Sequence, residues 1–195
     1  EVVRATHKLA INQLTTAITV LDTNFDPDPY NDAHEPSQLI KFALSRYFLI
    51  PETLQSDSIT RVISAKMKLI RSGLQSETLL KVGRLSNANA AGVVKKPVNK
   101  EITESHHLTT PQGLRVGAIH ISDDSITTQT LIHEASHKFA QTDDYFYFNP
   151  ANPSEVGYSN EIEQGDGIFN ADSYSFAARF ISHVVRGEPS DIKEE

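Results

Sequence analysis

In the first third of the chain, apolar side chains recur every three to four residues, which is the spacing of one face of an α-helix. The pattern predicts helices over residues 1–22, 37–48 and 57–73, with the third helix stopping at Gly73. The segment between the first two helices is rich in proline and aspartate, and we expect a loop there. Residues 1–76 are therefore predicted to form a helical N-terminal part.

The pattern changes over residues 78–195. β-Branched residues broken by glycine and asparagine predict short strands over residues 78–98, and residues 111–122 resemble a further strand. Three more elements are expected in chain order: a helix that begins near Asp123 with Ile132, Ala135 and Phe139 on its inward face, a long loop over residues 148–169, and a last helix over residues 171–186. The chain is thus predicted to be a single, mostly helical α+β domain with a small sheet, covering residues 1–195.

The composition is that of an ordinary globular protein, with 38% hydrophobic and 22% charged residues. A formal net charge of −7 argues against nucleic acid or an anionic membrane surface as a partner, because both require basic patches. No apolar run approaches the roughly 18 residues of a membrane span. The absence of cysteine excludes disulfides and thiolate metal sites. The sequence starts at Glu1, so we expect a mature or excised part of a secreted or exported protein.

One stretch carries a His-Glu-x-x-His motif, formed by His133, Glu134 and His137. In a helix the two histidines stand one turn apart on one face, where both imidazoles can bind one Zn²⁺. Glu134 lies about 100° further round the helix and can face a metal-bound water. Catalytic zinc takes three protein ligands and keeps one open position, so a third ligand has to come from elsewhere in the chain.

Two known zinc-protease patterns fit the rest of the sequence poorly. The metzincin pattern requires a glycine where Ala140 stands, a ligand at Asp143 and a downstream methionine, whereas the one methionine is Met67, far upstream. The gluzincin pattern takes a glutamate from a second helix, but nearby glycines disfavour a helix there. We keep it as an alternative, with these candidate ligands: Glu155, Glu161 and Glu163.

The segment after the motif resembles a signature of the aspzincins, the family of deuterolysin and lysine-specific metalloendopeptidases. The signature reads Gly-Thr-x-Asp-x-x-Tyr-Gly, and its threonine, aspartate and tyrosine fall on Thr142, Asp144 and Tyr147. Gln141 and Phe148 replace its two glycines. A second segment is similar to an Asn-Ala-Asp-x-Tyr-like segment of that family, and it reads Asn170-Ala171-Asp172-Ser173-Tyr174.

The resemblance implies a zincin-like metalloprotease domain that uses zinc to hydrolyse peptide bonds in protein substrates. The zinc ligands that it implies are His133, His137 and Asp144. Asp143 stays an alternative to Asp144, because the two missing glycines can shift the turn by one residue. Glu134 is implied to be the general base that activates the zinc-bound water, and Tyr147 a hydrogen-bond donor to the transition state.

Asp172 is implied to take part in substrate binding, because an acid at the matching place in lysine-specific members helps to receive the substrate lysine. Those members have a second acid three residues on, where this chain has Ser175, which weakens the expectation of a lysine preference. We also expect residues 114–121 to form an edge strand that pairs with an extended peptide substrate. The lack of cysteine separates the chain from the disulfide-bonded fungal members and favours a bacterial relative.

A function of another class stays open. In a non-catalytic protein-interaction domain, the His-Glu-x-x-His match would be a coincidence or a remnant. The sequence also leaves open whether the chain is a fragment of a longer toxin or effector.

Overall fold

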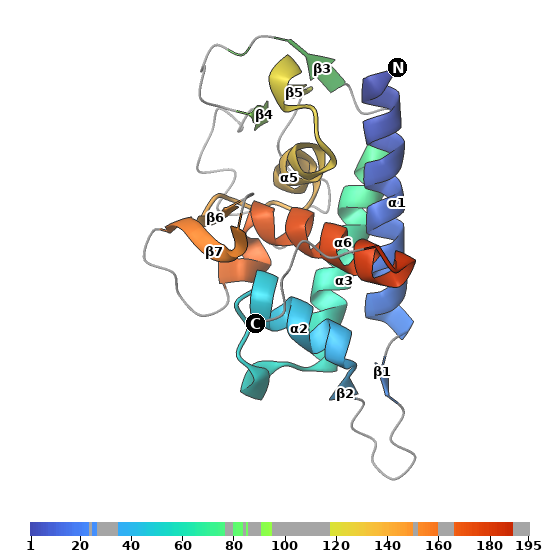
Figure 1. The fold of residues 1–195 in the computed structure, drawn as a ribbon, viewed down its shortest axis with the longest axis vertical. Coiled ribbons are helices and arrows are strands. Elements are labelled where there is room, and N and C mark those ends of the chain that lie inside the picture. Colours follow the sequence, from blue (N-terminus) through green and yellow to red (C-terminus); the bar gives the residue numbers. More distant parts are fainter. Residues whose placement is uncertain are drawn as a thin grey trace.

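The computed structural model describes residues 1–23, 25–26, 35–76, 80–83, 85, 91–94, 118–149, 152–159 and 166–188. Within these ranges the chain is mostly helical and carries small sheets, which confirms the predicted α+β class (Figure 1). None of the helices in the described ranges is both long and apolar enough to cross a bilayer.

The body of the molecule is a set of packed helices. They are α1 (Val2–Thr23), α2 (Gln38–Tyr47), α3 (Asp57–Gln75), α5 (Thr128–Phe139) and α6 (Ala171–Arg186). α1 contacts α3, α5 and α6, while α5 also packs against α3 and α6 (Figure 1). These contacts bury one apolar core that draws on both parts of the chain; its fully buried members include Leu14, Ile63, Met67, Ile132 and Tyr174. The predicted helices of the N-terminal part and the last helix are confirmed.

Gly73 does not stop the third helix, as the sequence predicted, because α3 continues to Gln75. The glycine is buried inside the helix, and a Cβ atom at this position would overlap the ring of Phe139 on α5. Gly73 therefore serves close packing between two helices. Glycine costs roughly 1 kcal/mol in a helix relative to alanine, and the approach of α5 to α3 explains why it is accepted here.

The main sheet contains β3 (Leu80–Val82), β4 (Gly92–Val94) and β5 (Ile119–Ile121), in the order β3-β5-β4. β5 runs parallel to β3 and antiparallel to β4. The strand expected at the sheet edge is therefore central over residues 119–121, while residues 114–117 lie outside the described ranges. The edge strand that contacts α5 is β4, so the prediction of β5 as a free edge was wrong.

The long loop predicted over residues 148–169 is also wrong where the structure describes it. β6 (Phe146–Asn149) and β7 (Asn152–Ser159) form an antiparallel hairpin with register shifts, and a 3-10 turn over Asp166–Phe169 leads into α6. The side chains of Phe146 and Phe148 are buried while Tyr147 between them is exposed. This alternation is the signal of a half-buried strand, although the following prolines and glycines dominate the local composition.

Two shorter features complete the described chain. β1 (Phe25–Asp26) and β2 (Glu35–Pro36) pair antiparallel within the segment that was predicted to be a loop. At the other end, α6 stops at Gly187, whose φ of +65° lies in the left-handed region that glycine adopts without steric cost.

Candidate metal centre

His133 lies in the middle of α5 and His137 in its last turn, and the apolar core packs against one side of this helix. Ile132 and Ala135 are fully buried, so the opposite side of the helix carries His133 towards a pocket. The helix begins at Thr127, whose hydroxyl accepts a hydrogen bond from the Thr130 amide at 3.0 Å. The predicted start near Asp123 is displaced, because Asp123–Ser125 forms a separate 3-10 turn.

Three acceptor atoms meet beside this helix. The Nε2 atoms of His133 and His137 are 3.0 Å apart, and each lies 3.2 Å from Oδ1 of Asp144. Among the described residues these three side chains form a group in which all ligand atoms lie within 4.8 Å of one another. Asp144 comes from the segment between α5 and β6, so the structure brings together the three residues that the resemblance named.

The other ring nitrogen of each histidine is also engaged. Nδ1 of His133 lies 2.7 Å from Oδ1 of Asp172, and Nδ1 of His137 lies 2.8 Å from the backbone oxygen of Thr142. A carboxylate and a carbonyl accept hydrogen bonds, so these contacts place a proton on both Nδ1 atoms. In the neutral rings both Nε2 lone pairs then point at the shared space, which is the tautomer that a metal ligand requires.

The spacing of these atoms fits zinc. Four ligands at about 2.0–2.1 Å in tetrahedral geometry stand roughly 3.3–3.4 Å apart. The three separations here are 3.0, 3.2 and 3.2 Å. Two imidazoles and one carboxylate are also a donor set that zinc accepts in catalytic sites. The residues present therefore fit the metal that the motif implies.

The electrostatics of the site favour a cation at the same point. Burial alone would lower the pKa of His133, but its hydrogen bonds with Asp144 and Asp172 outweigh burial and raise that pKa to about 10. Burial opposes ionisation of Asp144, yet the hydrogen bonds from His133 and His137 hold the pKa of its carboxyl well below its usual range. A proton on Nε2 of His133 and a metal ion thus compete for the same lone pair, and binding of a metal would release that proton.

The turn after α5 decides which aspartate faces the histidines. Gln141 has a φ of +55°, the left-handed conformation, at the position where the aspzincin signature has its first glycine. The chain therefore makes that turn with glutamine in place of glycine. The backbone of Asp143 pairs with the residues at the start of α6. Its amide donates to the Phe169 backbone oxygen at 2.8 Å, and its backbone oxygen accepts from the Ala171 amide at 3.0 Å. Both aspartates are exposed, but Oδ1 of Asp144 lies 3.2 Å from Nε2 of both histidines, whereas Asp143 is not part of the group of ligand atoms.

The start of α6 holds this turn in place. Oδ1 of Asn170 accepts hydrogen bonds from the amides of Tyr145 and Phe146 at 3.0 and 3.1 Å. Oδ2 of Asp172 accepts one from the Phe148 amide at 3.0 Å, while Oδ1 holds His133. Both residues are buried. The segment Asn170–Tyr174, which resembles the second aspzincin segment, thus ties the loop that carries Asp144 to α6.

Other contacts at the turn were not found from the sequence. Nζ of Lys66 on α3 donates to the backbone oxygen of Ala140 at 2.7 Å, at the C-terminal end of α5 where a cation is favoured. The buried Thr142 hydroxyl lies 2.7 Å from Oγ of Ser136. Lys66 and Ala140 are far apart in the sequence, and Ser136 meets Thr142 only through the turn after α5. No local sequence pattern therefore indicates either contact.

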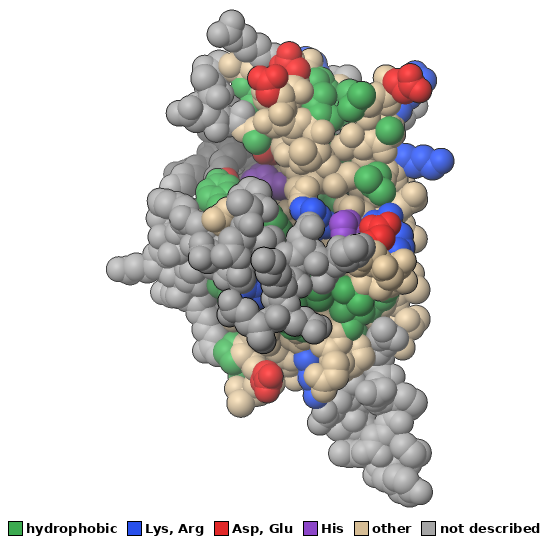
Figure 2. Space-filling view, viewed as in Figure 1, with side chains coloured by type: hydrophobic (Ala, Val, Ile, Leu, Met, Phe, Trp, Pro, Cys, Tyr) green, Lys and Arg blue, Asp and Glu red, His purple; other side chains and the backbone are tan. Residues whose placement is uncertain are grey.

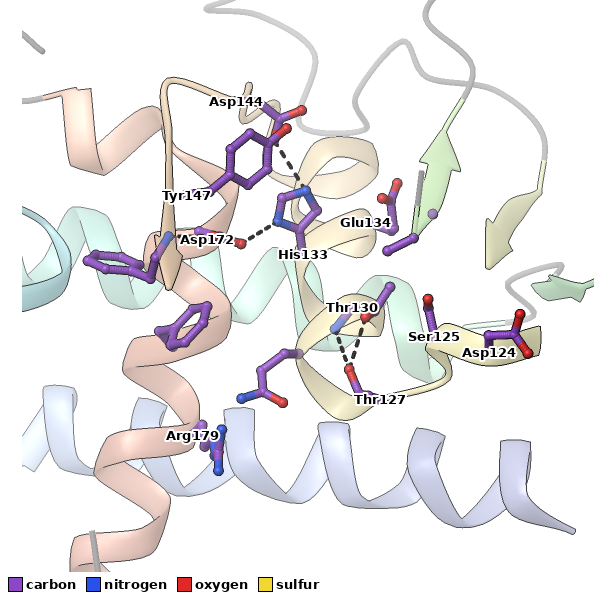
Figure 3. A pocket seen from close by; sticks show the side chains of 15 residues that line it. Asp124, Ser125, Thr127, Thr130, His133, Glu134, Asp144, Tyr147, Asp172 and Arg179 are labelled. Atoms are coloured by element: carbon purple, nitrogen blue, oxygen red, sulfur yellow. Dashed lines mark hydrogen bonds and ion pairs between the residues drawn. The ribbon is translucent and has the colours of Figure 1, made fainter. Parts of the chain in front are cut away.

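Glu134 and Tyr147 border the same pocket from two sides (Figure 3). Glu134 is 5% exposed and lies under β4, where a Cβ atom added to Gly92 would stand 2.5 Å from its Cγ. The ring of Tyr147 stacks on that of His133 at 6.1 Å. Burial, the charge of Asp144 and a hydrogen bond with Asp144 raise the pKa of Tyr147, so its hydroxyl keeps its proton at neutral pH. The cavity has a volume of about 740 Å³.

The downstream glutamates of the gluzincin alternative give no ligand that the structure describes. Glu161 and Glu163 lie outside the described ranges, and the side chain of Glu155 on β7 is not described either. Figure 2 shows acidic and basic side chains scattered over the described surface of one face rather than gathered in a block of one sign. The expectation that the chain does not bind nucleic acid stays a prediction.

The mostly helical α+β fold is similar to that of a solved zinc peptidase. A solved zinc peptidase from Grifola frondosa matches it with a TM-score of 0.56 and 16% sequence identity, over 94% of this chain and 94% of that one. At this identity the match establishes a shared fold. No family model matches the chain, and no curated protein does. The expected bacterial origin receives no support from this neighbour and stays a prediction.

The left-handed turn at Gln141 gives a testable consequence for stability. A residue with a Cβ atom costs roughly 1–2 kcal/mol in this conformation, so Gln141→Gly should raise the free energy of unfolding by up to about 1 kcal/mol after the entropy cost of glycine. Gln141→Val should lower it, because a branched Cβ is less tolerated there. Urea unfolding monitored by circular dichroism measures both. Equal stability of the two variants would contradict the assigned backbone conformation.

Proposed function

We propose that the chain is a zinc metalloendopeptidase of the aspzincin type, which hydrolyses peptide bonds in protein or peptide substrates. The observation that carries the proposal is the convergence of three acceptor atoms from His133, His137 and Asp144 at distances that fit one zinc ion. The name of the Grifola frondosa neighbour, a zinc peptidase of the same fold, supports the class of reaction. Export from the cell remains part of the proposal.

Each side chain of the centre has a role in this proposal. Bound zinc supplies Lewis acidity, which lowers the pKa of a coordinated water to about 7 and polarises a carbonyl group. The Glu134 carboxylate accepts the proton of the attacking water and passes it to the leaving amine. The protonated hydroxyl of Tyr147, on the side of the pocket opposite Glu134, donates a hydrogen bond to the oxyanion that forms on the substrate (Figure 3).

The contacts of Asp172 favour a positioning role over the substrate-binding role that the resemblance implied. Both of its oxygens have partners in the protein, namely Nδ1 of His133 and the amide of Phe148. A carboxylate behind a ligating histidine fixes the ring and makes it a better ligand. We therefore propose that Asp172 acts on the metal through His133.

The first test separates the general base from the metal ligands. Glu134→Gln should retain one zinc per chain, because this side chain is outside the ligand group, and should lower kcat for peptide cleavage by about 10²–10⁴-fold. The measurements are zinc analysis by mass spectrometry and a peptide cleavage assay. Full activity of Glu134→Gln would refute the assignment of the base. A wild-type protein without zinc or cleavage would instead favour a non-catalytic interaction domain.

Two adjacent aspartates provide a matched pair for the third ligand. Asp144→Ala should lose zinc at micromolar metal concentration, because the site keeps only two ligands. Asp143→Ala should retain zinc, since this side chain is outside the ligand group and the pairing of Asp143 with the start of α6 uses the backbone. Competition against a chromophoric chelator measures both affinities. The reverse order would move the ligand by one residue, and equal affinities would point to a ligand elsewhere, such as a downstream glutamate.

Asp172→Asn tests the positioning role. An amide can accept from His133 with its oxygen, but its NH₂ group then faces the Phe148 amide, another donor. Zinc affinity should fall by about 10–100-fold. Asp124→Asn, at the pocket rim, is the control and should leave zinc affinity unchanged. If Asp172→Asn raises KM with zinc affinity intact, then Asp172 binds substrate instead.

A further inference from the structure

The edge strand β4 contacts α5 at the residue that the proposed function uses as general base. Gly92, the first residue of β4, lies against the side chain of Glu134 (Figure 3). A Cβ atom added to Gly92 would stand 2.5 Å from Cγ of Glu134 and 2.6 Å from both Cδ and Oε1. Because carbon atoms in van der Waals contact are about 3.5–4.0 Å apart, a side chain at position 92 would overlap the outer part of Glu134.

The backbone at Gly92 does not itself require glycine. Among the described residues the glycine with a positive φ is Gly187, so position 92 has a backbone conformation that other residues adopt. What glycine provides there is space. The side chain of Glu134 takes up this space and is only 5% exposed.

Neither partner of this contact moves aside easily. β4 is fixed on β5, because Gly92 pairs with Ile121 and the Ser122 amide donates to the Ala91 backbone oxygen at 2.9 Å. Ile121 is 1% exposed and belongs to the apolar core. Within the Glu134 side chain, Cγ moves only with the first torsion, which has a few staggered positions. An overlap at Cγ therefore displaces the whole carboxylate and cannot be relieved by rotation of its end.

We propose that Gly92 is a positioning residue for the general base, and that its missing side chain lets the Glu134 carboxylate face the pocket of the candidate metal centre. The inference rests on the proposed peptidase function and adds a residue to the machinery of that site. A general base must lie within about 2.6–3.2 Å of the group whose proton it accepts. A methyl group at position 92 would push Glu134 aside by roughly 1 Å, and a displacement of this size can cost about 10²-fold in rate.

Gly92→Ala tests this role with one methyl group. The kcat for peptide cleavage, normalised to zinc content, should fall by about 10–100-fold, while KM stays near the wild-type value. Zinc affinity should not change, because the contact does not involve the group of ligand atoms. A rise in KM with kcat unchanged would mean that the methyl group obstructs the substrate directly, and it would overturn the positioning role.

Gly83→Ala is the matched control. Gly83 follows β3, on the other side of β5, and its amide donates to the Ile121 backbone oxygen at 3.1 Å. Apart from its own neighbours in the chain, a Cβ atom there would meet no atom of the described residues within 4 Å. The control makes the same substitution beside the same residue of β5, and kcat, zinc affinity and Tm should stay near their wild-type values.

A cycle of thermal unfolding measurements shows whether the effect passes through Glu134. All variants are measured in the same zinc-containing buffer. Gly92→Ala should lower Tm by several degrees relative to Gly83→Ala, because of the overlap. In the Glu134→Ala background the same substitution should not lower Tm, since Cγ, Cδ and Oε1 are then absent. If Gly92→Ala alone does not fold, folding of the double variant supports the same conclusion. An equal loss of Tm in both backgrounds, or a double variant that does not fold, overturns the contact.

The outcomes separate this inference from the function on which it rests. If the wild-type chain cleaves peptides and Gly92→Ala keeps the wild-type kcat, the role of Gly92 is overturned and the peptidase proposal stands. If the zinc-loaded wild-type chain cleaves no peptide, the proposed function fails and the role of Gly92 fails with it. The unfolding cycle then reports only on the packing of β4 against α5.

Discussion

The structure depends on three acceptor atoms that are held close together. Two imidazole nitrogens and a carboxylate oxygen meet within 3.0–3.2 Å, beside a helix whose other side is buried in the core. Acceptors behind both rings fix the lone pairs towards one another. Such an arrangement is repulsive unless positive charge lies at its centre. A proton relieves the repulsion in part, and hydrogen bonds with Asp144 and Asp172 accordingly raise the pKa of His133. A divalent cation at the centre would carry twice the charge of that proton.

The rest of the fold keeps these atoms from moving apart. α6 contributes the most: Asn170 holds two amides of the segment that follows Asp144, and Asp172 holds both a ligand ring and the first strand of the hairpin. α3 contributes through Lys66, which donates a hydrogen bond to the Ala140 carbonyl at the C-terminal end of α5. It also contributes through Gly73, which lets the two helices approach. Each contact joins elements that are distant in the sequence, so the centre forms only when the helices are packed.

The sequence was a good guide to the helices and to the residues that meet at the centre. Helical periodicity gave α1, α2, α3 and α6, and the motif together with its resemblance named the side chains that now converge. It failed where a distant neighbour decides the local structure. Gly73 was predicted to end a helix. The residue that requires glycine there is Phe139, which lies on another helix and cannot be recognised from the local sequence. The hairpin after Tyr145 was hidden by its prolines and glycines, although the alternation of Phe146, Tyr147 and Phe148 indicated it.

The central claim is that zinc is bound by two imidazole nitrogens and one carboxylate oxygen, and X-ray absorption at the zinc edge tests it most directly. The spectrum of the zinc-loaded chain should show a first shell of nitrogen and oxygen at about 2.0–2.1 Å, with the outer-shell scattering of two imidazole rings. Substitution of either motif histidine should remove one ring from that signal. A spectrum of six oxygens without imidazole scattering, or a chain that takes up no zinc, would contradict the account.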